Sequence, residues 1–513
     1  MSSILVEFNS SIWNLHAQPG QTLLDVLRQA GLAVSAPCGG NGTCGKCHVT
    51  LETMEGTTQV LACQTSVTDD CRIHLELESG GRICAQDFVS SEYHLHSRKG
   101  YGAAIDLGTT TIAIRLFDLF SGEEVAQISD WNCQRPYGND VITRCQYCME
   151  HSDGLEFLSH LIRQQILKLL SQMCNEINIA PQEVTELCLS GNTVMQHLFS
   201  EISPVSIAVA PFRPTLLFEQ PLNYHLGSAA LFYSPCVSGY IGGDITAGLL
   251  SCGLDSKDKL ALFLDIGTNG EMALWDHGHF VCCSVASGPA FEGAGISCGM
   301  SSTQGAISHV RWNQGKPEYE VIGGGVPKGL CGSGLLDLLA MLLELGAVDE
   351  SGYLLPPEEA PCALSNWLGE DEQGNGIFYL TSDQTIYFTA SDVRQLQLAK
   401  AAVAAGISVL MEHTGHILSQ LDTLYLAGGF GTHMNPRSAI AIGMLPQTIE
   451  TRIVCVGNSS LAGTSMVLLD PSKREKLLDI QKSCNYLELS GNAVFNHFFP
   501  EHMTFDKEES PWK

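Results

Sequence analysis

Four cysteines near the N-terminus have the spacing of a redox metal site. Cys38, Cys44, Cys47 and Cys63 are separated by five, two and fifteen residues, and the first three lie in a glycine-rich stretch. Four thiolates can hold one [2Fe–2S] cluster, which transfers single electrons. Glycines suit such a loop because they reach positive φ angles and leave backbone N–H groups exposed to the sulfurs. A structural zinc site is the alternative, but zinc sites usually pair two C-x2-C units. We therefore predict a [2Fe–2S] cluster.

The flanking sequence predicts the fold that holds this loop. Residues 4–8 and 12–16 alternate in hydrophobicity like two strands, and residues 22–31 have the apolar spacing of a helix that ends at a glycine. Hairpin, helix and cysteine loop in this order resemble the β-grasp [2Fe–2S] ferredoxins. The resemblance implies an α+β ferredoxin-like domain over residues 1–88 and a polar linker over 89–100. The last cysteine departs from hydroxylase-type ferredoxins, in which it follows much later.

Charge and composition narrow the class of protein. The chain has 27 Lys and Arg against 55 Asp and Glu, a net charge of −28, which argues against nucleic acid and anionic membranes as partners. It has no apolar run of about 18 residues, so no membrane span is predicted, and its N-terminus lacks the features of a signal peptide. The other cysteines are scattered through apolar stretches, which predicts a reducing, cytoplasmic location with little oxygen.

Two copies of one motif predict a phosphate site. Each copy consists of an apolar strand, an aspartate, a glycine–threonine turn and a second strand. The turn offers backbone N–H groups and hydroxyls to phosphate oxygens, and the aspartate can hold Mg2+ through water. The first copy contains Asp106, Gly108, Thr109 and Thr110, and the second contains Asp265, Gly267, Thr268 and Asn269. Two copies indicate a duplication whose lobes face one nucleotide.

A third segment completes the pattern. The apolar residues 423–427 run into Gly428, Gly429 and Phe430, and a double glycine lets the backbone approach a base or ribose closely. In this order the three segments resemble the superfamily of actin, heat-shock chaperones and sugar kinases, whose lobes close around Mg-ATP. The resemblance implies a two-lobed α/β actin-like ATPase with duplicated ribonuclease H-like lobes. We predict lobe I over residues 101–250, lobe II with a C-terminal return over 251–505, and a tail over 506–513.

Further segments narrow the resemblance. Residues 237–244, 286–294, 329–335 and 396–403, taken with the N-terminal module, resemble the reductive activators of corrinoid proteins. That family uses ATP to return an inactive Co(II) corrinoid to Co(I) in methyl-transfer systems. The resemblance implies a [2Fe–2S] cluster, ATP and Mg2+ as cofactors, and adds Gly332 and Ser333 to the nucleotide-binding residues. It implies a corrinoid protein and an upstream low-potential electron donor as partners, and leaves a homodimer open. Some members carry an extra middle domain before the ATPase, and here we expect only a linker.

Roles and alternatives remain open at this point. Asp106 and Asp265 are expected to manage Mg2+ and the attacking water, while Glu271 and Asp244 are both candidates for the general base. One alternative function is an ATPase that injects electrons into a radical dehydratase. A second is a redox-sensing regulatory protein in which the cluster controls nucleotide binding. Electron transfer that depends on ATP would distinguish an activator from a sensor.

Overall fold

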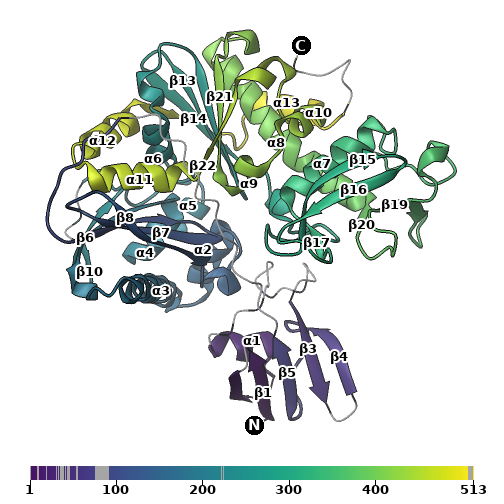
Figure 1. The fold of residues 1–513 in the computed structure, drawn as a ribbon, viewed down its shortest axis with the longest axis horizontal. Coiled ribbons are helices and arrows are strands. Elements are labelled where there is room, and N and C mark those ends of the chain that lie inside the picture. Colours follow the sequence, from purple (N-terminus) through teal and green to yellow (C-terminus); the bar gives the residue numbers. More distant parts are fainter. Residues whose placement is uncertain are drawn as a thin grey trace.

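The structure is a computed structural model of the chain. It describes residues 2–8, 11–18, 20–30, 32, 34, 40, 42, 47–53, 56–75, 92–220, 222, 224–505 and 512. Two of the predicted cluster ligands, Cys38 and Cys44, and residues 76–91 lie outside this part of the chain. Figure 1 shows a small N-terminal module below two larger lobes, with an insertion of lobe II extending to the right.

The described part of the N-terminal module is a five-stranded sheet with one helix across it. The strand order is β2-β1-β5-β3-β4, with β1 antiparallel to β2 and parallel to β5. Thr22 begins the helix with a reciprocal capping box to Asp25, which satisfies N–H groups that have no partner in the helix. The predicted hairpin and helix are thus confirmed. The elements are β1 (Ser2–Phe8), β2 (Ser11–Ala17), α1 (Leu23–Gln29), β3 (His48–Thr53), β4 (Gly56–Leu61) and β5 (Cys71–Leu75).

The linker follows the surface of the two lobes where it is described. His96 N–H donates to the Leu469 carbonyl and Arg98 N–H to the Leu119 carbonyl, both at 3.0 Å. The Arg98 guanidinium also pairs with Glu186, at 2.5 Å from Nε to Oε1. His94 N–H also donates to Asp470 Oδ2, so residues 94–98 are hydrogen-bonded to the lobes at every second residue, although their sequence has no periodicity.

Lobe I is built on a six-stranded sheet of order β10-β11-β9-β6-β7-β8. Strands β6, β7 and β8 form an antiparallel meander, and β6 is parallel to β9. The strands are β6 (Tyr101–Leu107), β7 (Thr111–Asp118), β8 (Glu124–Trp131), β9 (Val184–Gly191), β10 (Tyr224–Leu226) and β11 (Ala229–Tyr233). The helices are η1 (Arg135–Tyr137), α2 (Val141–Glu150), α3 (Gly154–Glu176), η2 (Pro181–Glu183), α4 (Thr193–Ser200), α5 (Val205–Ala208), α6 (Gly243–Cys252) and η3 (Leu254–Ser256).

Lobe II repeats this plan with the sheet order β22-β21-β12-β13-β14-β23. Strands β12, β13 and β14 form the meander, and β12 is parallel to β21. The strands are β12 (Ala261–Ile266), β13 (Gly270–Asp276), β14 (His279–Val285), β21 (Thr423–Ala427), β22 (Ile453–Gly457) and β23 (Cys484–Tyr486). The helices are η4 (Pro289–Glu292), α8 (Ala390–Thr414), η6 (Leu418–Gln420), α9 (Gly428–His433), α10 (Pro436–Ala441), η7 (Gln447–Arg452), α11 (Ser459–Leu469), α12 (Lys473–Ser483) and α13 (Ala493–Glu501). The repeated topology confirms the duplicated fold.

The insertion of lobe II lies between η4 and α8. It contains two small three-stranded sheets, of order β16-β15-β17 and β18-β19-β20. Its elements are β15 (Ala306–Asn313), β16 (Lys316–Val321), β17 (Gly329–Leu330), α7 (Gly332–Glu344), η5 (Cys362–Leu364), β18 (Leu368–Glu370), β19 (Gly376–Tyr379) and β20 (Tyr387–Thr389).

Two helices cross closely between the lobes. A Cβ atom added to Gly463 of α11 would lie 1.9 Å from the Ala247 carbonyl oxygen of α6, so only glycine permits this approach. One apolar cluster contains Ala104 of lobe I and Phe263 of lobe II. The boundary that we predicted at 250/251 falls inside α6, and we place it instead in the loop 257–260.

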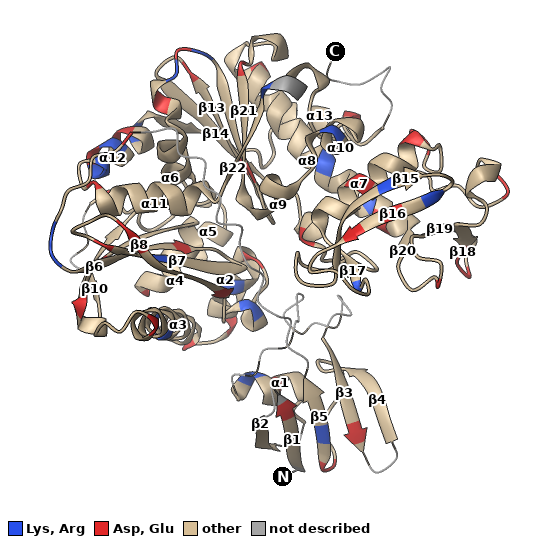
Figure 2. Ribbon diagram, viewed as in Figure 1, with Lys and Arg blue, Asp and Glu red and all other residues tan. Residues whose placement is uncertain are grey.

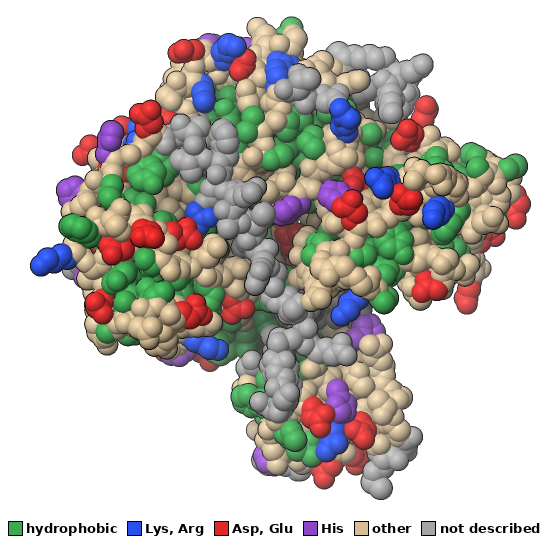
Figure 3. All heavy atoms as spheres, in the orientation of Figure 1, with side chains coloured by type: hydrophobic (Ala, Val, Ile, Leu, Met, Phe, Trp, Pro, Cys, Tyr) green, Lys and Arg blue, Asp and Glu red, His purple; other side chains and the backbone are tan. Residues whose placement is uncertain are grey.

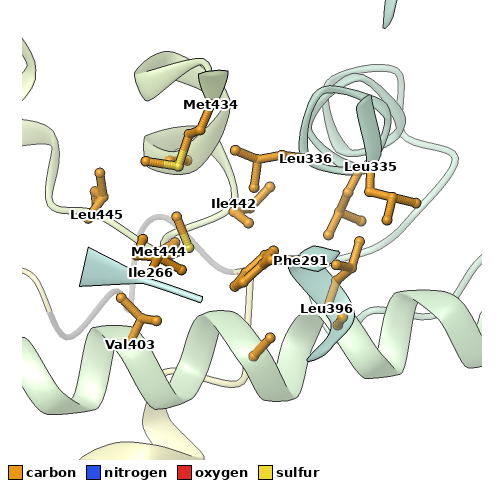
Figure 4. Packing of buried hydrophobic residues seen from close by; sticks show 14 of the residues in the cluster. Ile266, Phe291, Leu335, Leu336, Leu396, Val403, Met434, Ile442, Met444 and Leu445 are labelled. Carbon is orange, nitrogen blue, oxygen red and sulfur yellow. The ribbon is translucent and has the colours of Figure 1, made fainter. Parts of the chain in front are cut away.

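A separate core supports the insertion and the second phosphate loop. Figure 4 shows apolar side chains from β12, η4, α7, α8 and the chain on either side of α10 around Phe291. This packing determines where the end of β12 lies relative to α8. Figure 2 shows Lys and Arg scattered over the lobes, apart from a short group on α12, rather than gathered into a broad basic face in this view. None of the described helices has the length and apolar character needed to cross a membrane.

Candidate nucleotide and cluster sites

The two motif aspartates lie at corresponding strand ends. Asp106 is near the end of β6 and Asp265 near the end of β12. Desolvation by burial raises the pKa of both, and the neighbouring Asp106 charge helps to raise that of Asp265 to about 7. Asp106 also accepts hydrogen bonds from Asn458 Nδ2 and Ser460 Oγ, both at 2.8 Å, which act to lower its pKa. The two lobes therefore bring the predicted pair together.

Two more carboxylates complete an acidic cluster. Burial, together with the charges of Asp265 and Asp106, raises the pKa of Asp244 to about 8. Burial and the charges of Asp244 and Asp265 raise the pKa of Glu271 well above its ordinary value. Four carboxylates this close repel one another in the absence of a cation, because like charges disfavour ionisation. Figure 3 shows a hollow in this face of the molecule, with acidic atoms inside it. Among the described residues, no three Asp, Glu, His or Cys side chains are placed to ligate a metal ion directly.

The first phosphate loop is held from behind by a neighbouring segment. Asn132 donates from Nδ2 to the Gly108 carbonyl at 2.8 Å and from its backbone N–H to the Thr110 carbonyl at 2.9 Å. Arg144 Nη2 donates to the Thr109 carbonyl at 2.5 Å. Three successive carbonyls are thus engaged, which leaves the opposite edge of these peptides for a ligand. Sequence reasoning missed Asn132 and Arg144, because neither belongs to a recognisable motif.

The second phosphate loop has a different support. Gly267 N–H donates to the Asn269 carbonyl at 2.8 Å, so the turn closes on itself. Ser287 Oγ lies 3.4 Å from the Gly267 carbonyl oxygen and 3.2 Å from that of Thr268. This hydroxyl follows β14 directly, so the loop is held from within lobe II.

A glutamate joins the two loops across the lobes. Glu292 accepts from Thr268 Oγ1 at 2.7 Å through Oε1 and from Thr110 Oγ1 at 3.4 Å through Oε2. These hydroxyls are among the groups predicted to bind phosphate oxygens, so the carboxylate stands where an anionic ligand would compete with it. We did not predict Glu292 as a site residue, although its segment contributed to the family resemblance.

The double-glycine loop reaches the acidic cluster. Gly428 has a φ of +83°, and a Cβ atom there would lie 2.4 Å from Asp265 Oδ1. Gly429 has nothing within 4 Å of an added Cβ, so open space faces it, as a base or ribose would require. The Phe430 ring stacks on Phe291 with centroids 4.7 Å apart.

The predicted Gly332–Ser333 pair has two different environments. A Cβ atom on Gly332 would lie 1.9 Å from the Phe291 carbonyl oxygen and 2.8 Å from Phe430 Cδ2, so the glycine permits the approach of these two elements. Ser333 is 3 % exposed, and its hydroxyl lies 3.4 Å from Cys331 Sγ. This burial favours a structural role for Ser333 over the nucleotide contact that we predicted.

Two of the four predicted cluster ligands are described, and they converge. Cys47 Sγ and Cys63 Sγ are 3.3 Å apart, and the Cys63 N–H points to Cys47 Sγ at 3.5 Å. Gly40 and Gly42 have φ angles of +103° and +75°, so the loop uses the backbone freedom of glycine, as the sequence predicted. Thiols that face one another, with backbone N–H groups directed at sulfur, fit the donor set of an iron–sulfur cluster.

Comparison with known proteins agrees with both halves of this arrangement. Residues 6–68 match the model of the 2Fe-2S iron-sulfur cluster binding domain. Residues 101–257 match the RACo middle region, and residues 259–513 match the C-terminal domain of RACo, described as the ASKHA domain. The chain belongs to the RACo family. The resemblance to reductive activators and the predicted fold class are therefore confirmed.

Similar proteins cover nearly the whole chain. The corrinoid activation enzyme RamQ of Eubacterium limosum is 29 % identical over 92 % of this chain and 94 % of its own length. The [Co(II) methylated amine-specific corrinoid protein] reductase of Methanosarcina barkeri is 24 % identical over 78 % of this chain and 76 % of its own length. The solved structure of a reductive activator for a corrinoid, iron–sulfur protein is 29 % identical, covers both chains completely and has a TM-score of 0.72.

The match to the family's middle region concerns one expectation about the order of the domains. We expected only a linker between the cluster module and the ATPase, and the middle-region model matches residues 101–257. In the structure these residues form the six-stranded lobe I and its helices. The chain therefore carries a middle region, and it is part of the two-lobed fold rather than a separate unit before it.

Proposed function

We propose that this protein uses ATP to drive the one-electron reduction of a corrinoid protein from Co(II) to Co(I). One observation carries the proposal: a converging thiol pair, Cys47 and Cys63, occurs in the same chain as two phosphate loops bridged by Glu292. The names of the relatives connect this combination with corrinoid activation. When bound, a [2Fe–2S] cluster would supply the single electron.

Different groups of the chain contact different parts of the nucleotide. Hydroxyls and N–H groups of both loops bind phosphate oxygens, and binding there displaces the Glu292 carboxylate from the threonines. Asp106 and Asp265 would hold Mg2+ through water, and the bound cation would reduce the mutual repulsion of the acidic cluster. The open space at Gly429 receives the base or ribose. Both lobes must contribute, so nucleotide binding favours their closure.

Asp244 and Glu271 are both candidates for the general base. A base is most effective when its pKa lies near the operating pH, and the pKa of Asp244 is about 8. Glu271 is raised well above its ordinary value by burial and by two neighbouring carboxylates. Mg2+ in the cluster would lower both pKa values, since a nearby cation favours the ionised form.

The need for ATP follows from the energetics of the electron. Co(I) corrinoids lie at very low potential, whereas plant-type [2Fe–2S] ferredoxins lie near about −400 mV. Each 100 mV uphill costs about 2.3 kcal/mol for one electron. Lobe closure can contribute this free energy only if the protein binds the two cobalt states differently. We therefore propose that the closed ATPase holds the Co(II) partner with altered axial ligation, and that a low-potential donor re-reduces the N-terminal module.

The test follows Co(I) formation directly. The reduced protein, Mg-ATP and an as-isolated Co(II) corrinoid protein of a methyl-transfer system are mixed without oxygen, and the Co(I) absorption band is recorded. Asp265→Ala should bind or hydrolyse ATP poorly and form no Co(I), although its cluster spectrum is unchanged. Cys44→Ser should keep its nucleotide binding and form no Co(I).

Matched substitutions separate these effects from general damage. Asp258→Ala replaces an exposed aspartate of lobe II, and Cys362→Ser replaces an exposed cysteine far along the chain from the cluster loop. Both should activate the corrinoid protein like the parent. Co(I) formation by Asp265→Ala at the parental rate would show that ATP does not drive the electron, and would favour a redox-sensing protein instead.

A further inference from the structure

One segment connects the first phosphate loop to the N-terminal module, and none of the roles above uses this connection. Its first part is Asn132, which holds the carbonyls of Gly108 and Thr110. Its last part is Arg144 of α2, which holds the carbonyl of Thr109. We call residues 132–144 the coupling segment.

Arg144 joins the two ends of the coupling segment. It is completely buried, and its remaining contacts include Nε to the Gly138 carbonyl at 2.9 Å and Nη1 to Gln134 Oε1 at 3.2 Å. Burial lowers its pKa to about 9, so the side chain is still charged at neutral pH. A buried charge is costly unless its donors are bonded. The guanidinium therefore links the Thr109 carbonyl to the Gly138 carbonyl through its own hydrogen bonds.

The residue before Gly138 contacts the N-terminal module. Tyr137 donates from its hydroxyl to the Arg28 carbonyl of α1 at 3.2 Å, and the Arg28 guanidinium carbon lies 5.9 Å from the centre of the Tyr137 ring. Tyr147 and Phe157 pack edge-on against the same ring, at 5.4 and 4.9 Å. In Figure 1 the module lies below lobe I, with α1 at its upper side. Helix α1 therefore contacts lobe I at an aromatic group formed by Tyr137, Tyr147 and Phe157.

Helix α1 in turn touches the loop of the predicted cluster ligands. A Cβ atom placed on Gly40 would lie 3.1 Å from Leu24 Cδ2 and 3.4 Å from Arg28 Nη1. The contacts therefore run without a break from Thr109 through Arg144, Gly138 and Tyr137 to Arg28 and the cluster loop.

We propose that the coupling segment makes the docking of α1 on lobe I depend on the nucleotide in the first phosphate loop. The inference rests on the proposed function, because it needs a nucleotide at that loop. The reason is the rigidity of the peptide group: each carbonyl held by Asn132 or Arg144 is coplanar with the N–H group of the next residue. When phosphate oxygens accept hydrogen bonds from these N–H groups, the peptides rotate. The carbonyls of the same peptides then move relative to Asn132 and Arg144, which shifts the coupling segment.

The experiment measures amide hydrogen exchange in α1 of the full, cluster-loaded chain, with and without a Mg-bound non-hydrolysable ATP analogue. In the parent, the analogue should change the exchange rate of residues 23–30 by about threefold or more, since docking decides how often the helix opens locally. Tyr137→Phe removes the hydroxyl contact with Arg28 and should abolish this response. Its ATP hydrolysis without a corrinoid protein should equal that of the parent.

Two further variants define the role of each residue. Tyr147→Phe is the matched control, because among the described residues the Tyr147 hydroxyl has no hydrogen bond, and its response should equal that of the parent. Arg144→Lys keeps the charge, but its single nitrogen cannot reach acceptors that are bonded by three separate guanidinium nitrogens, so the variant should bind the analogue with little response in α1. If this variant does not fold, Tyr137→Phe alone decides.

Three results would overturn the proposal. A parent that binds the analogue with no change in α1 would refute the coupling and leave ATP-driven reduction intact. A parental response in Tyr137→Phe would show that the contact does not transmit nucleotide binding. A parent that binds no nucleotide would refute the proposed function itself, and the coupling with it.

Discussion

Phosphate loop 1, at the end of β6, and phosphate loop 2, at the end of β12, have the same motif and different neighbours. Loop 1 is held through three carbonyls by Asn132 and Arg144, which belong to a segment that reaches the N-terminal module. Loop 2 is held by its own Asn269 and by Ser287, within its own lobe. Duplication has kept the loop itself and changed what the loop is attached to.

The aspartates of the two motifs differ in the same way. Asp106 receives two hydrogen bonds from Asn458 and Ser460, in the segment that enters α11. Asp265 lies against Gly428, and its pKa is raised to about 7 by burial and by Asp106. The comparison teaches that Asp106 is positioned by the connection between the lobes. Asp265 is not held by these two hydrogen bonds, so we expect a bound cation to stabilise its ionised form more than that of Asp106.

The largest effect should come from these two carboxylates. Asp265→Asn should lower ATP hydrolysis by about 100-fold or more, because a metal ion contributes several kcal/mol to stabilising the transferred phosphoryl group. Asp106→Asn should lower it similarly and should also weaken the contact with Asn458, so its melting temperature should fall further. Steady-state hydrolysis and thermal melting measure both. Equal melting temperatures would remove the distinction drawn between the two aspartates.

The second-largest effect should come from alanine substitutions at the two motif glycines, which should change nucleotide binding to different extents in the two loops. A Cβ atom on Gly108 would lie 2.4 Å from the Thr111 carbonyl oxygen, whereas one on Gly267 would have its nearest atom at 3.8 Å. We expect Gly108→Ala to weaken nucleotide binding by about 10- to 100-fold through loop distortion. Gly267→Ala should change it by less than about threefold. Titration calorimetry checks this, and similar losses in both variants would contradict the different supports of the loops.

The pH dependence of Mg-ATP affinity should show which carboxyl groups are protonated in the free protein. The pKa values of Asp265 and Asp244, about 7 and about 8, lie above the value near 3.8 of the unfolded chain. Without nucleotide, the folded protein binds these two protons more tightly than the unfolded chain does. The free energy of unfolding that they contribute is therefore fully present below pH 4 and is lost as the pH rises towards 8. Mg-ATP must displace these protons, so its affinity should rise from pH 6 to pH 8, by about tenfold for the Asp265 proton alone and by more when the Asp244 proton also leaves.

Calorimetry in two buffers of different ionisation enthalpy measures the protons released on binding. Asp265→Asn should release fewer protons than the parent. Equal proton release by the parent and Asp265→Asn would show that Asp265 is already ionised in the free protein.

The smallest effect concerns the bridge between the loops. Glu292→Gln keeps the size of the side chain and removes its charge, so phosphate no longer meets a competing anion at Thr110 and Thr268. We expect ATP to bind about threefold more tightly, as befits one partly exposed charge. Isothermal titration with the non-hydrolysable analogue tests this, and a weaker affinity would instead make Glu292 a ligand that helps to bind the nucleotide or its cation.

The sequence by itself determined the motifs and the type of fold. A cluster or a phosphate needs particular donors at fixed spacing, so Cys47, Cys63 and both D-x-G-T turns could be recognised from short stretches. The duplication was equally visible, because each aspartate follows an apolar strand and precedes another. Structure then showed the same strand order around β6 and β12, and the positive φ at Gly428 accounts for the double glycine.

Only the tertiary structure decided what surrounds those motifs. Asn132 and Arg144 reach loop 1 through bonds to backbone carbonyls, and such bonds require no particular sequence pattern at the acceptor. Glu292 meets Thr110 and Thr268 because the two lobes face each other, a relation that no local spacing encodes. The burial of Ser333 and the position of the lobe boundary beyond α6 likewise depend on how distant helices pack. Side chains that act across elements become visible only when the chain has brought those elements together.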